Sequence, residues 1–479
     1  MLYLLKIVHI FAKHDGLGLV RRVWLFRILR WIYPSKNSLK DEVKFTNAVK
    51  ELGPAFIKMG QALSLRPDII GQEYATALSK LQDSLDPFDT EQARAIIESE
   101  LKGKVEDLFE SFDDTPIAAA SIAQVHYAVS NDGTKVAVKL LRPDIEETFS
   151  RDIKLFFLIS RIAPKLKKRF RKKLELMRLD ELVSDFEAQS KRELNLTYEA
   201  ACASELKNNL KTISDIVTIP DVDWDRTSQR VLTTTRLIGV KINDKAALAQ
   251  QGISGKSLVP KLAKLYFEQV YENGYFHADL HPGNIFVLED GKLGLVDFGI
   301  MGHITQKEKR FVATIAYSYL NRDYQKAADT YFEAGYVPAN QDRKILALYL
   351  RAIGEPIYGT PEQEGSIAWI LGETLKVTEQ FEMQTQPQLI LLQKTMVYME
   401  GLVVVLDENE NFWVHCHPLL IDWAKRNLSY RALPNELKQE LRQFTANVKK
   451  LNDTLPHIID TLESAGARYA HDVQNQSGA

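Results

Sequence analysis

The sequence predicts an α+β protein with helical segments at both ends and strands in its centre. Residues 1–105 show amphipathic periodicity with few β-branched runs, which is typical of helices. In the centre, two pairs of short apolar segments flank turn sequences, and this pattern predicts two β-hairpins. After the second hairpin the helical periodicity returns and continues, with breaks at prolines, toward Ala479.

The first predicted hairpin joins Ile122–Val129 to Thr134–Leu141 through the turn sequence Asn131-Asp132-Gly133. The second hairpin joins Ile285–Leu288 to Leu293–Val296. The segments between the hairpins are expected to be a charged helical stretch, two short strands and a further helix: 145–212, Val217–Ile219, Arg230–Thr234 and Lys256–Gly274.

The composition is that of a folded globular protein. Of the 479 residues, 45% are hydrophobic and 26% are charged, which excludes wholesale disorder. The formal net charge is −2, so we expect no nucleic-acid partner. The two cysteines exclude a disulfide framework and a four-thiolate zinc site.

We predict no transmembrane helix, because no stretch reaches about 18 uninterrupted apolar residues. The nearest candidate, Leu389–Leu406, is interrupted by Lys394 and Glu400, so we expect a buried helix there. The first 50 residues contain ten Lys or Arg and three Asp or Glu, interleaved with apolar residues that include Trp24 and Trp31. Such a basic amphipathic helix suits an anionic membrane surface, and a helix packed on its own protein fits the pattern equally well.

The strongest functional signal is the segment His277–Asn284, which reads HADLHPGN and is followed by the sequence VDFG. Its spacing is that of the catalytic and metal-binding loops of protein kinases. Phosphoryl transfer depends on positioning and on neutralising phosphate charge. Asn284 and Asp297 supply oxygen ligands of the kind that Mg²⁺ prefers. Asp279 would orient or deprotonate the attacking hydroxyl or water.

The second signal is Val136-Ala137-Val138-Lys139, which closes the first hairpin as the nucleotide-binding lysine does in kinases. The Lys139 ammonium would pair with the nucleotide phosphates and with a helical glutamate. Thr235 lies where the hinge between lobes should be, and its backbone would contact adenine.

The loop before the first strand lacks the glycines with which an ordinary kinase covers the phosphates. Where an ordinary kinase has glycines, this loop has three alanines and a serine. The Cβ of each restricts the backbone and occupies space near the phosphates. We therefore expect the nucleotide to be held differently here. The four residues are Ala118, Ala119, Ala120 and Ser121.

Taken together, these motifs resemble the UbiB family of atypical kinase-like proteins, the ADCK type in eukaryotes. The resemblance runs in order from about Pro54 to about Gly302. It is carried by four features: the K-x-G-Q motif at 58–61, the alanine-rich loop AAAS at 118–121, the segment RELNLTYEA at 192–200, and HADLHPGN with VDFG.

The resemblance implies a two-lobed protein-kinase-like fold, with a helical N-terminal extension over the active cleft and a helical C-terminal region. The implied parts are an extension with the basic amphipathic segment and K-x-G-Q, an N-lobe with a helical insertion, a C-lobe core, and a helical part of the C-lobe with a tail. Their boundaries are 1–105, 106–236, 237–345 and 346–479.

Within this fold, the resemblance implies that Glu199 pairs with Lys139. It also implies a set of four regulatory residues. Lys58 and Gln61 would enter the cleft from the extension, and Glu193 would meet them there. The fourth is Asn195. Asn195 departs from the family pattern, which has aspartate there, so a salt bridge or metal role at this position loses its charge.

The resemblance further implies a Mg²⁺-dependent ATPase that binds ATP or ADP and is needed for ubiquinone biosynthesis. It would act peripherally at an anionic membrane surface, on the cytoplasmic face of a bacterial inner membrane. Its partners would be quinone precursor lipids or the ubiquinone biosynthetic enzymes. The chain has no A-P-E motif after VDFG and no room for a long activation segment, which disfavours folded protein substrates. A protein or small-molecule kinase and a non-catalytic, nucleotide-switched scaffold remain alternatives.

Overall fold

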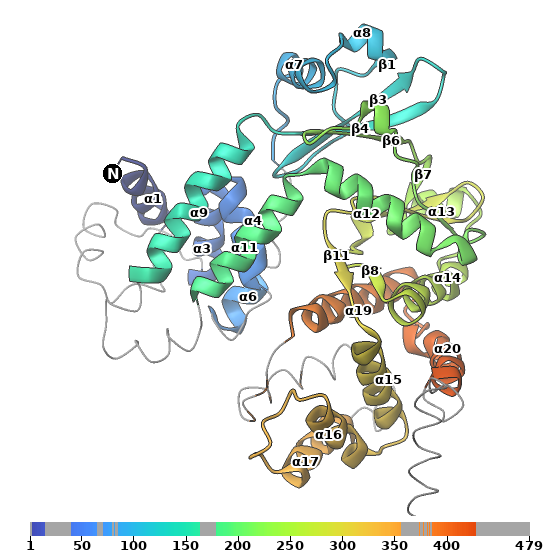
Figure 1. Ribbon diagram of the computed structural model, residues 1–479. Helices are drawn as coiled ribbons and strands as arrows, with labels where there is room; N and C mark the ends of the chain where they lie inside the picture. Colours follow the sequence, from blue (N-terminus) through green and yellow to red (C-terminus); the bar gives the residue numbers. More distant parts are fainter. Residues whose placement is uncertain are drawn as a thin grey trace, which may run out of the picture.

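The chain forms three parts, which Figure 1 shows from the N-terminal helices to the C-terminal ones. A helical group lies beside an antiparallel sheet, and a helix-rich part with two smaller sheets follows. This mixture of helices and sheets, ending in helices, confirms the predicted α+β class. The computed structural model describes residues 2–14, 40–64, 70–78, 81, 85–162, 179–355, 373, 377, 381, 383 and 386–427.

The first part is a group of helices from two separate stretches of sequence (Figure 1). Aromatic side chains hold it together: the Phe56 and Phe156 rings lie 4.9 Å apart, and Phe149 stacks on Phe186. Tyr3 donates a hydrogen bond to the buried carboxylate of Asp152, which ties the first helix to the group. The helices are α1 (Leu2–Lys13), α3 (Asp41–Leu52), α4 (Pro54–Ser64), α6 (Gln72–Leu78), α9 (Ile145–Ile162) and α11 (Leu179–Glu193).

Two features expected from the sequence lie outside the described residues. The basic segment with Trp24 and Trp31 falls within residues 15–39, and the charged C-terminal tail begins after Asn427. The expectation that the first of these contacts a membrane therefore stays a prediction.

The N-lobe sheet has five antiparallel strands in the order β1-β3-β4-β6, with β2 paired to β3. Alternating residues of the β4 strand, such as Val136, Val138 and Leu140, are buried against α7 and the neighbouring strands. The elements are α7 (Thr90–Leu101), α8 (Val105–Leu108), β1 (Phe109–Phe112), β2 (Ala118–Ala119), β3 (Ala123–Ser130), β4 (Lys135–Leu141) and β6 (Val231–Thr235). The β3–β4 hairpin confirms the first predicted one, within one residue at each strand end.

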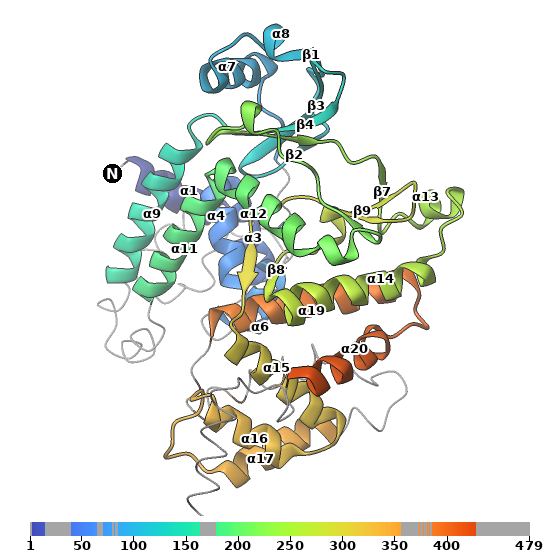
Figure 2. The same ribbon diagram turned by 45° about the vertical axis from the view of Figure 1, so that its right-hand side comes forward.

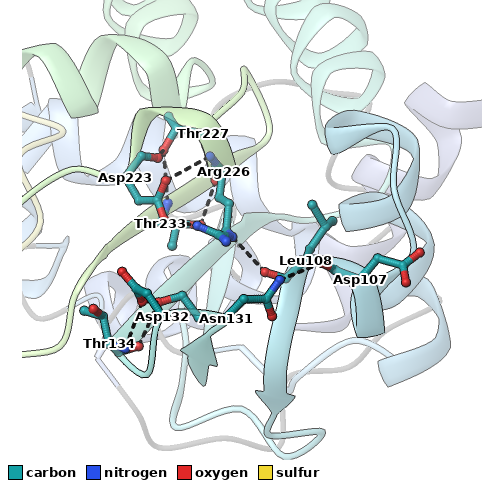
Figure 3. Close-up of polar contacts among 10 residues, drawn as sticks. Asp107, Leu108, Asn131, Asp132, Thr134, Asp223, Arg226, Thr227 and Thr233 are labelled. Carbon is teal, nitrogen blue, oxygen red and sulfur yellow. Dashed lines mark hydrogen bonds and ion pairs between the residues drawn. The ribbon is translucent and has the colours of Figure 1, made fainter.

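Side-chain hydrogen bonds to the backbone lock the outer edge of this sheet, as Figure 3 shows. Arg226 Nε donates to the Leu108 carbonyl at 2.7 Å, and Asn131 Nδ2 donates to the Asp107 carbonyl at 2.8 Å. Asp132 Oδ1 accepts from the Thr134 backbone N–H at 3.0 Å, which fixes the hairpin turn. These bonds tie α8 and β1 to the strands that carry the site.

The C-lobe contains a four-stranded sheet in the order β5-β10-β9-β7 and a two-stranded sheet of β8 and β11. The β9–β10 hairpin confirms the second predicted one. Its apolar residues Ile285, Val287, Leu293 and Leu295 are fully buried in the largest core of the chain. The strands are β5 (Val217–Thr218), β7 (Gly239–Lys241), β8 (Tyr275–His277), β9 (Ile285–Leu288), β10 (Leu293–Leu295) and β11 (Met301–His303).

Helices surround these two sheets. Figure 2 shows α19 running alongside α14, with which it is in contact. The helices are α12 (Leu196–Asn209), α13 (Lys245–Gln250), α14 (Gly255–Phe267), α15 (Gln306–Leu320), α16 (Tyr324–Glu333), α17 (Arg343–Gly354), α19 (Pro387–Leu406) and α20 (Phe412–Asn427). Short 3-10 turns occur at Lys211–Ile213, Trp224–Arg226 and Pro282–Asn284, and a π-helix occurs at Glu268–Asn273.

Among the described helices, α19 alone is long and apolar enough to cross a membrane. Its core-facing residues, including Met396, Met399 and Leu402, are fully buried against the protein. Its two charged residues also make polar contacts: Lys394 binds Asp279, and Glu400 accepts a hydrogen bond from the Trp413 indole. The absence of a transmembrane helix stays a prediction.

The structure corrects the sequence analysis in the C-lobe. The helix expected over Lys256–Gly274 is an α-helix only as far as Phe267 and continues as a π-helix. The sequence analysis also missed β7, β8 and β11, each of three residues. These strands are too short to show an alternating pattern, and hydrogen bonds to distant partners define them.

Candidate active site

Lys139 lies at the centre of a chain of ion pairs that connects the N-lobe sheet to the loop after β10. It is on β4, paired with Val125 of β3 and Leu232 of β6, so its backbone is held on both sides. The Lys139 Nζ atom lies 2.8 Å from Glu199 Oε1 and 2.9 Å from Asp297 Oδ1. The structure therefore brings together three predicted site residues from three separate segments.

Asn195 explains how Glu199 reaches this position. The Asn195 side chain caps α12, because its Oδ1 accepts hydrogen bonds from the Thr197 N–H at 3.1 Å and the Tyr198 N–H at 3.3 Å. Glu199 follows in the first turn of the helix and is buried. Asparagine and aspartate are comparable caps, so the departure from the family aspartate leaves this structural role intact.

The pKa values of Glu199, Lys139 and Asp297 depend on one another, because the single Lys139 ammonium forms ion pairs with both carboxylates. Burial raises the pKa of Glu199, and the charge of Lys139 only partly offsets this effect. Partial loss of hydration would also raise the pKa of Asp297, but the charge of Lys139 and its hydrogen bond outweigh this effect and lower that pKa. The pKa of Lys139 is raised, because the two carboxylates outweigh its desolvation. Asp297 thus stays ionised.

The backbone at Asp297 is left-handed, with φ of 64°. This conformation is uncommon outside glycine, and aspartate and asparagine tolerate it better than other residues. The turn leaves the Asp297 side chain 50% exposed, so its carboxylate reaches solvent as well as Lys139. The adjacent Phe298 is buried, with its ring centroid 5.6 Å from that of His277.

His277 orients the loop that carries Asp279. The His277 Nδ1 atom accepts from the Asp279 backbone N–H at 3.1 Å, so the ring proton is on Nε2, 3.2 Å from the Val296 carbonyl. Burial lowers the pKa of His277 and keeps the ring neutral. Gln269, in the π-helix, accepts from the His277 backbone N–H at 2.9 Å. One buried histidine thus connects the Asp279 loop to the residue before Asp297.

Asp279 has an ion-pair partner that the sequence analysis missed. Lys394 Nζ of α19 lies 2.8 Å from Asp279 Oδ1. In the sequence, Lys394 shows only as an interruption of an apolar run. The only sequence signal was its isolation, since it is the single lysine in a helix of 20 mostly apolar residues.

The extension contributes Lys58, whose Nζ lies 3.2 Å from Glu193 Oε2 at the end of α11. This is the contact that the family resemblance implies. The charge of Lys58 adds to the lowering of the Asp297 pKa that Lys139 causes, and it opposes the raised pKa that Asp279 gives Lys394, so Lys58 faces the same cluster. In all, three ammonium groups and four carboxylates alternate there, which leaves one net negative charge.

The remainder of the K-x-G-Q motif has a packing role. A Cβ at Gly60 would lie 2.7 Å from Leu81 Cδ1 and 3.3 Å from Leu78 Cδ2, so glycine allows α4 to approach these residues closely. Gln61 Nε2 donates to the Leu81 carbonyl at 3.2 Å. The structure thus places Gln61 against the extension, and no contact that it shows joins Gln61 to Lys139 or Asp297 within the described residues.

The predicted nucleotide loop is a tight turn of the β2–β3 hairpin. Ala118 and Ala119 pair with β3, and the Ala120 N–H donates to the Ala123 carbonyl at 2.7 Å. Arg142 at the end of β4 donates from Nε to the Ala120 carbonyl at 3.0 Å. Ser121 follows and is fully buried. The loop is therefore held by its own backbone and by one arginine.

Thr235 ends β6, and the Thr235 hydroxyl accepts from the Asp221 N–H at 2.8 Å. The Thr235 side chain thus contacts the segment before β6. The backbone after Thr235 leads to β7. The roles of Thr235 and of the loop residues in binding a nucleotide stay predictions.

Comparison with known proteins supports the interpretation of this site. A family model described as the ABC1 atypical kinase-like domain matches residues 80–331, more than half of the chain. A protein of Shewanella piezotolerans named "Probable protein kinase UbiB" is 37% identical over 442 residues, which cover 90% of this chain and 79% of that protein. One of the same name from Azotobacter vinelandii is 34% identical over 447 residues, 92% of this chain and 82% of the relative. The chain belongs to the UbiB family.

Two further matches extend this result. A model described as the UbiB helical domain matches residues 350–411, which include α19. The Rv3197–erythromycin complex from Mycobacterium tuberculosis contains a structure with a TM-score of 0.51 and 25% identity, covering 76% of this chain and 91% of that one. The predicted kinase-like fold is thereby confirmed, and the chain is an atypical kinase-like protein of the UbiB family.

The donor set in this UbiB-family site fits Mg²⁺ held together with phosphate. Asn284 is buried, and its Nδ2 donates to the Asp279 carbonyl at 3.1 Å, which leaves Asn284 Oδ1 as an acceptor. The Val296 N–H donates to the Asn284 carbonyl at 3.1 Å, which places Asn284 beside the residue that precedes Asp297. Among the described residues no group of three or more His, Cys, Asp or Glu side chains is placed to hold a metal ion. Mg²⁺ commonly takes one or two protein oxygens and completes its shell with phosphate and water.

Proposed function

We propose that this UbiB-family protein is a Mg²⁺-dependent ATPase that serves ubiquinone biosynthesis. The observation that carries the proposal is the Glu199–Lys139–Asp297 bridge, with N–O distances of 2.8 and 2.9 Å. It supplies a fixed ammonium for nucleotide phosphates and an ionised, half-exposed carboxylate beside it. When bound, Mg²⁺ would neutralise phosphate charge, and Asn284 and Asp297 are the residues to hold it. Asp279 would orient the attacking group.

Hydrolysis, rather than transfer to a folded protein, is supported by the short segment after Asp297. Only eight residues separate Asp297 from the start of α15 at Gln306, and three of them pair with β8 as β11. No long activation segment lies between them to dock a peptide. The relatives' name, "Probable protein kinase UbiB", favours transfer to an acceptor as the second candidate function.

The setting of this activity is proposed from the family. The role in ubiquinone biosynthesis comes from the UbiB resemblance, and the curated relatives cited above are bacterial. We infer that the protein acts peripherally on the cytoplasmic face of the inner membrane. Its substrates would be quinone precursor lipids, or it would act on the assembled biosynthetic enzymes.

The test compares the wild-type protein with D297N and with K135M. Lys135 lies on β4, the strand of Lys139, and is exposed, so K135M is a matched control. We expect D297N to lose Mg²⁺-dependent nucleotide binding and hydrolysis and to fail to restore quinone synthesis in a deficient strain, while K135M retains all three. Full rescue by D297N would overturn the ATPase proposal. Labelled phosphate appearing on a protein or metabolite, rather than in solution, would favour the second candidate.

A further inference from the structure

Lys394 is held against Asp279 by its position on α19, 115 residues away in sequence. The neighbours of Lys394 on the core side of α19, such as Leu392 and Met396, are fully buried and fix the helix in the C-lobe. Gln388, one and a half turns earlier, accepts from the His303 N–H of β11 at 3.3 Å. The packing of α19 thus fixes the Lys394 ammonium beside the loop that carries Asp279.

The contact with Lys394 leaves Asp279 with one oxygen occupied and one available. Lys394 Nζ binds Oδ1, and within the described part of the chain the second oxygen of Asp279 makes no hydrogen bond. The two side chains are 21% and 25% exposed, so neither is fully hydrated. Burial alone would raise the pKa of Asp279, and the charge of Lys394 outweighs it and lowers that pKa.

Other charged groups lie around this pair. His277 and His281 lie near Asp279, and Lys58 of the extension lies near Lys394. His277 is held neutral by burial, and Lys58 has Glu193 as its ion-pair partner at 3.2 Å. Tyr398, one turn after Lys394, stacks its ring edge on His281, with centroids 6.5 Å apart. Lys394 is thus the cation in hydrogen-bond contact with the Asp279 carboxylate.

Stability alone does not account for such a pair. A largely buried ion pair contributes little net stability compared with apolar residues of the same size, because both ions lose hydration. Apolar residues at both 279 and 394 would stabilise the fold at least as well as the pair does, whereas an apolar residue at 394 alone would leave Asp279 without its cation. The position of the lysine on the predicted nucleophile-orienting carboxylate points instead to the reaction.

We propose that Lys394 is a positioning residue for phosphoryl transfer, which binds one oxygen of Asp279, fixes the orientation of the carboxylate and leaves the other oxygen to accept the proton of the attacking water or hydroxyl. In this step the proton passes from the nucleophile to Asp279, the nucleophile oxygen bonds to the terminal phosphorus, and the bond from that phosphorus to the bridging oxygen breaks, so that ADP leaves with the electron pair. This inference rests on the proposed function.

The kinetic test measures ATP hydrolysis for K394M, K394R and K256M. Lys256 forms a pair of the same 2.8 Å length with Glu410, so K256M is the control for loss of an ion pair elsewhere in the protein. We expect K394M to lower kcat at least about tenfold, with KM changed less than about twofold, since a general base contributes about 10²–10⁴ to rate. K256M should stay within about threefold of wild type. K394R should recover part of the activity that K394M loses, because arginine also donates to a carboxylate but does so through a larger, planar group.

If the wild type hydrolyses ATP, two results would overturn the inference. One is a K394M variant with the same kcat and KM as the wild type. The other is a K394M change that lowers kcat by the same factor in the D279N variant as in the wild type. If the wild type neither binds nor hydrolyses ATP, the proposed function itself fails. The pairing of Lys394 with Asp279 can then be tested by a measurement that needs no ATP hydrolysis. Reductive ¹³C-methylation gives each lysine an NMR signal that reports its pKa, and loss of one signal in K394R assigns Lys394. We expect D279N to lower that pKa, and an unchanged titration would refute the pairing.

Discussion

Lys58 of the N-terminal extension lies 3.2 Å from Glu193 at the end of α11, and the two side chains are only 14% and 7% exposed. This pair joins the K-x-G-Q helix to the insertion that leads into α12. Since α12 carries Glu199, the extension and the centre of the site are connected through one ion pair and one helix cap.

Replacing Lys58 with Met should destabilise the protein by about 2–4 kcal/mol, because Glu193 would stay buried without its partner. The double variant K58M/E193Q should recover part of this loss. Lys13 and Glu51 form an exposed pair, so K13M should cost less than about 1 kcal/mol. Chemical unfolding measures all three, and an equal loss for K58M and K13M would contradict the buried character of the Lys58 pair.

Gly60→Ala and Gly401→Ala should have opposite effects on stability. An added Cβ at Gly60 meets Leu81 Cδ1 at 2.7 Å, whereas at Gly401 in α19 it meets nothing within 4 Å. We expect a loss of about 1 kcal/mol for G60A from overpacking and a gain of about 0.5–1 kcal/mol for G401A from helix propensity. The midpoints of denaturant unfolding give the sign of each, and a stabilised G60A would argue against close packing of α4.

Asn195→Ala should cost about 1 kcal/mol through loss of the α12 cap, and Asn195→Asp should stay within about 0.5 kcal/mol of the wild type. Because the cap positions Glu199, N195A should also weaken Mg²⁺-nucleotide binding. Asp244 caps α13, away from the Lys139 bridge, by accepting from the Ala247 N–H at 3.0 Å. D244A should therefore lose stability without losing nucleotide affinity. Thermal unfolding and calorimetric titration separate the two effects, and equal affinity losses would remove the link between cap and site.

The protein should lose stability as pH falls below about 6.5, because two buried histidines are held neutral. Burial lowers the pKa of His126 and of His277 from the ordinary value of 6.5. The unfolded chain therefore takes up these protons first, and each histidine removes up to about 1.4 kcal/mol per pH unit below that value. Unfolding measured from pH 8 to pH 5 should show this slope, and H126Q should reduce it by one proton. Exposed His303 is the control, and a slope that follows H303Q instead would refute the assignment.

Local sequence signals were sufficient for the hairpins and the loops. The Asn131-Asp132-Gly133 turn predicts the β3–β4 hairpin because its residues favour the required backbone, and the structure agrees within one residue. Asp279 and Asn284 lie in one short loop, and a single hairpin separates that loop from Asp297, so the three residues are predicted together from their spacing.

Long-range pairings were beyond local signals. The partner of Lys139 is 60 residues away, so Glu199 was expected only from the family resemblance. Lys394 is 115 residues from Asp279 and looked like a defect in an apolar helix, since a sequence does not show where a helix face points. The π-helix before β8 has no compositional signature. Within it, Gln269 accepts a hydrogen bond from the His277 backbone N–H, a contact that no local sequence pattern shows.

The ion-pair cluster has a practical consequence for how the protein can be divided. The ABC1 match covers residues 80–331, yet two of the three clustered ammonium groups, at Lys58 and Lys394, fall outside it. A recombinant fragment of residues 80–331 would contain Glu193 and Asp279 but would lack their ion-pair partners, Lys58 and Lys394. The proposed activity therefore needs the length of chain from the K-x-G-Q helix to α19, and truncation at either side should leave an electrostatically unbalanced core that does not hydrolyse ATP.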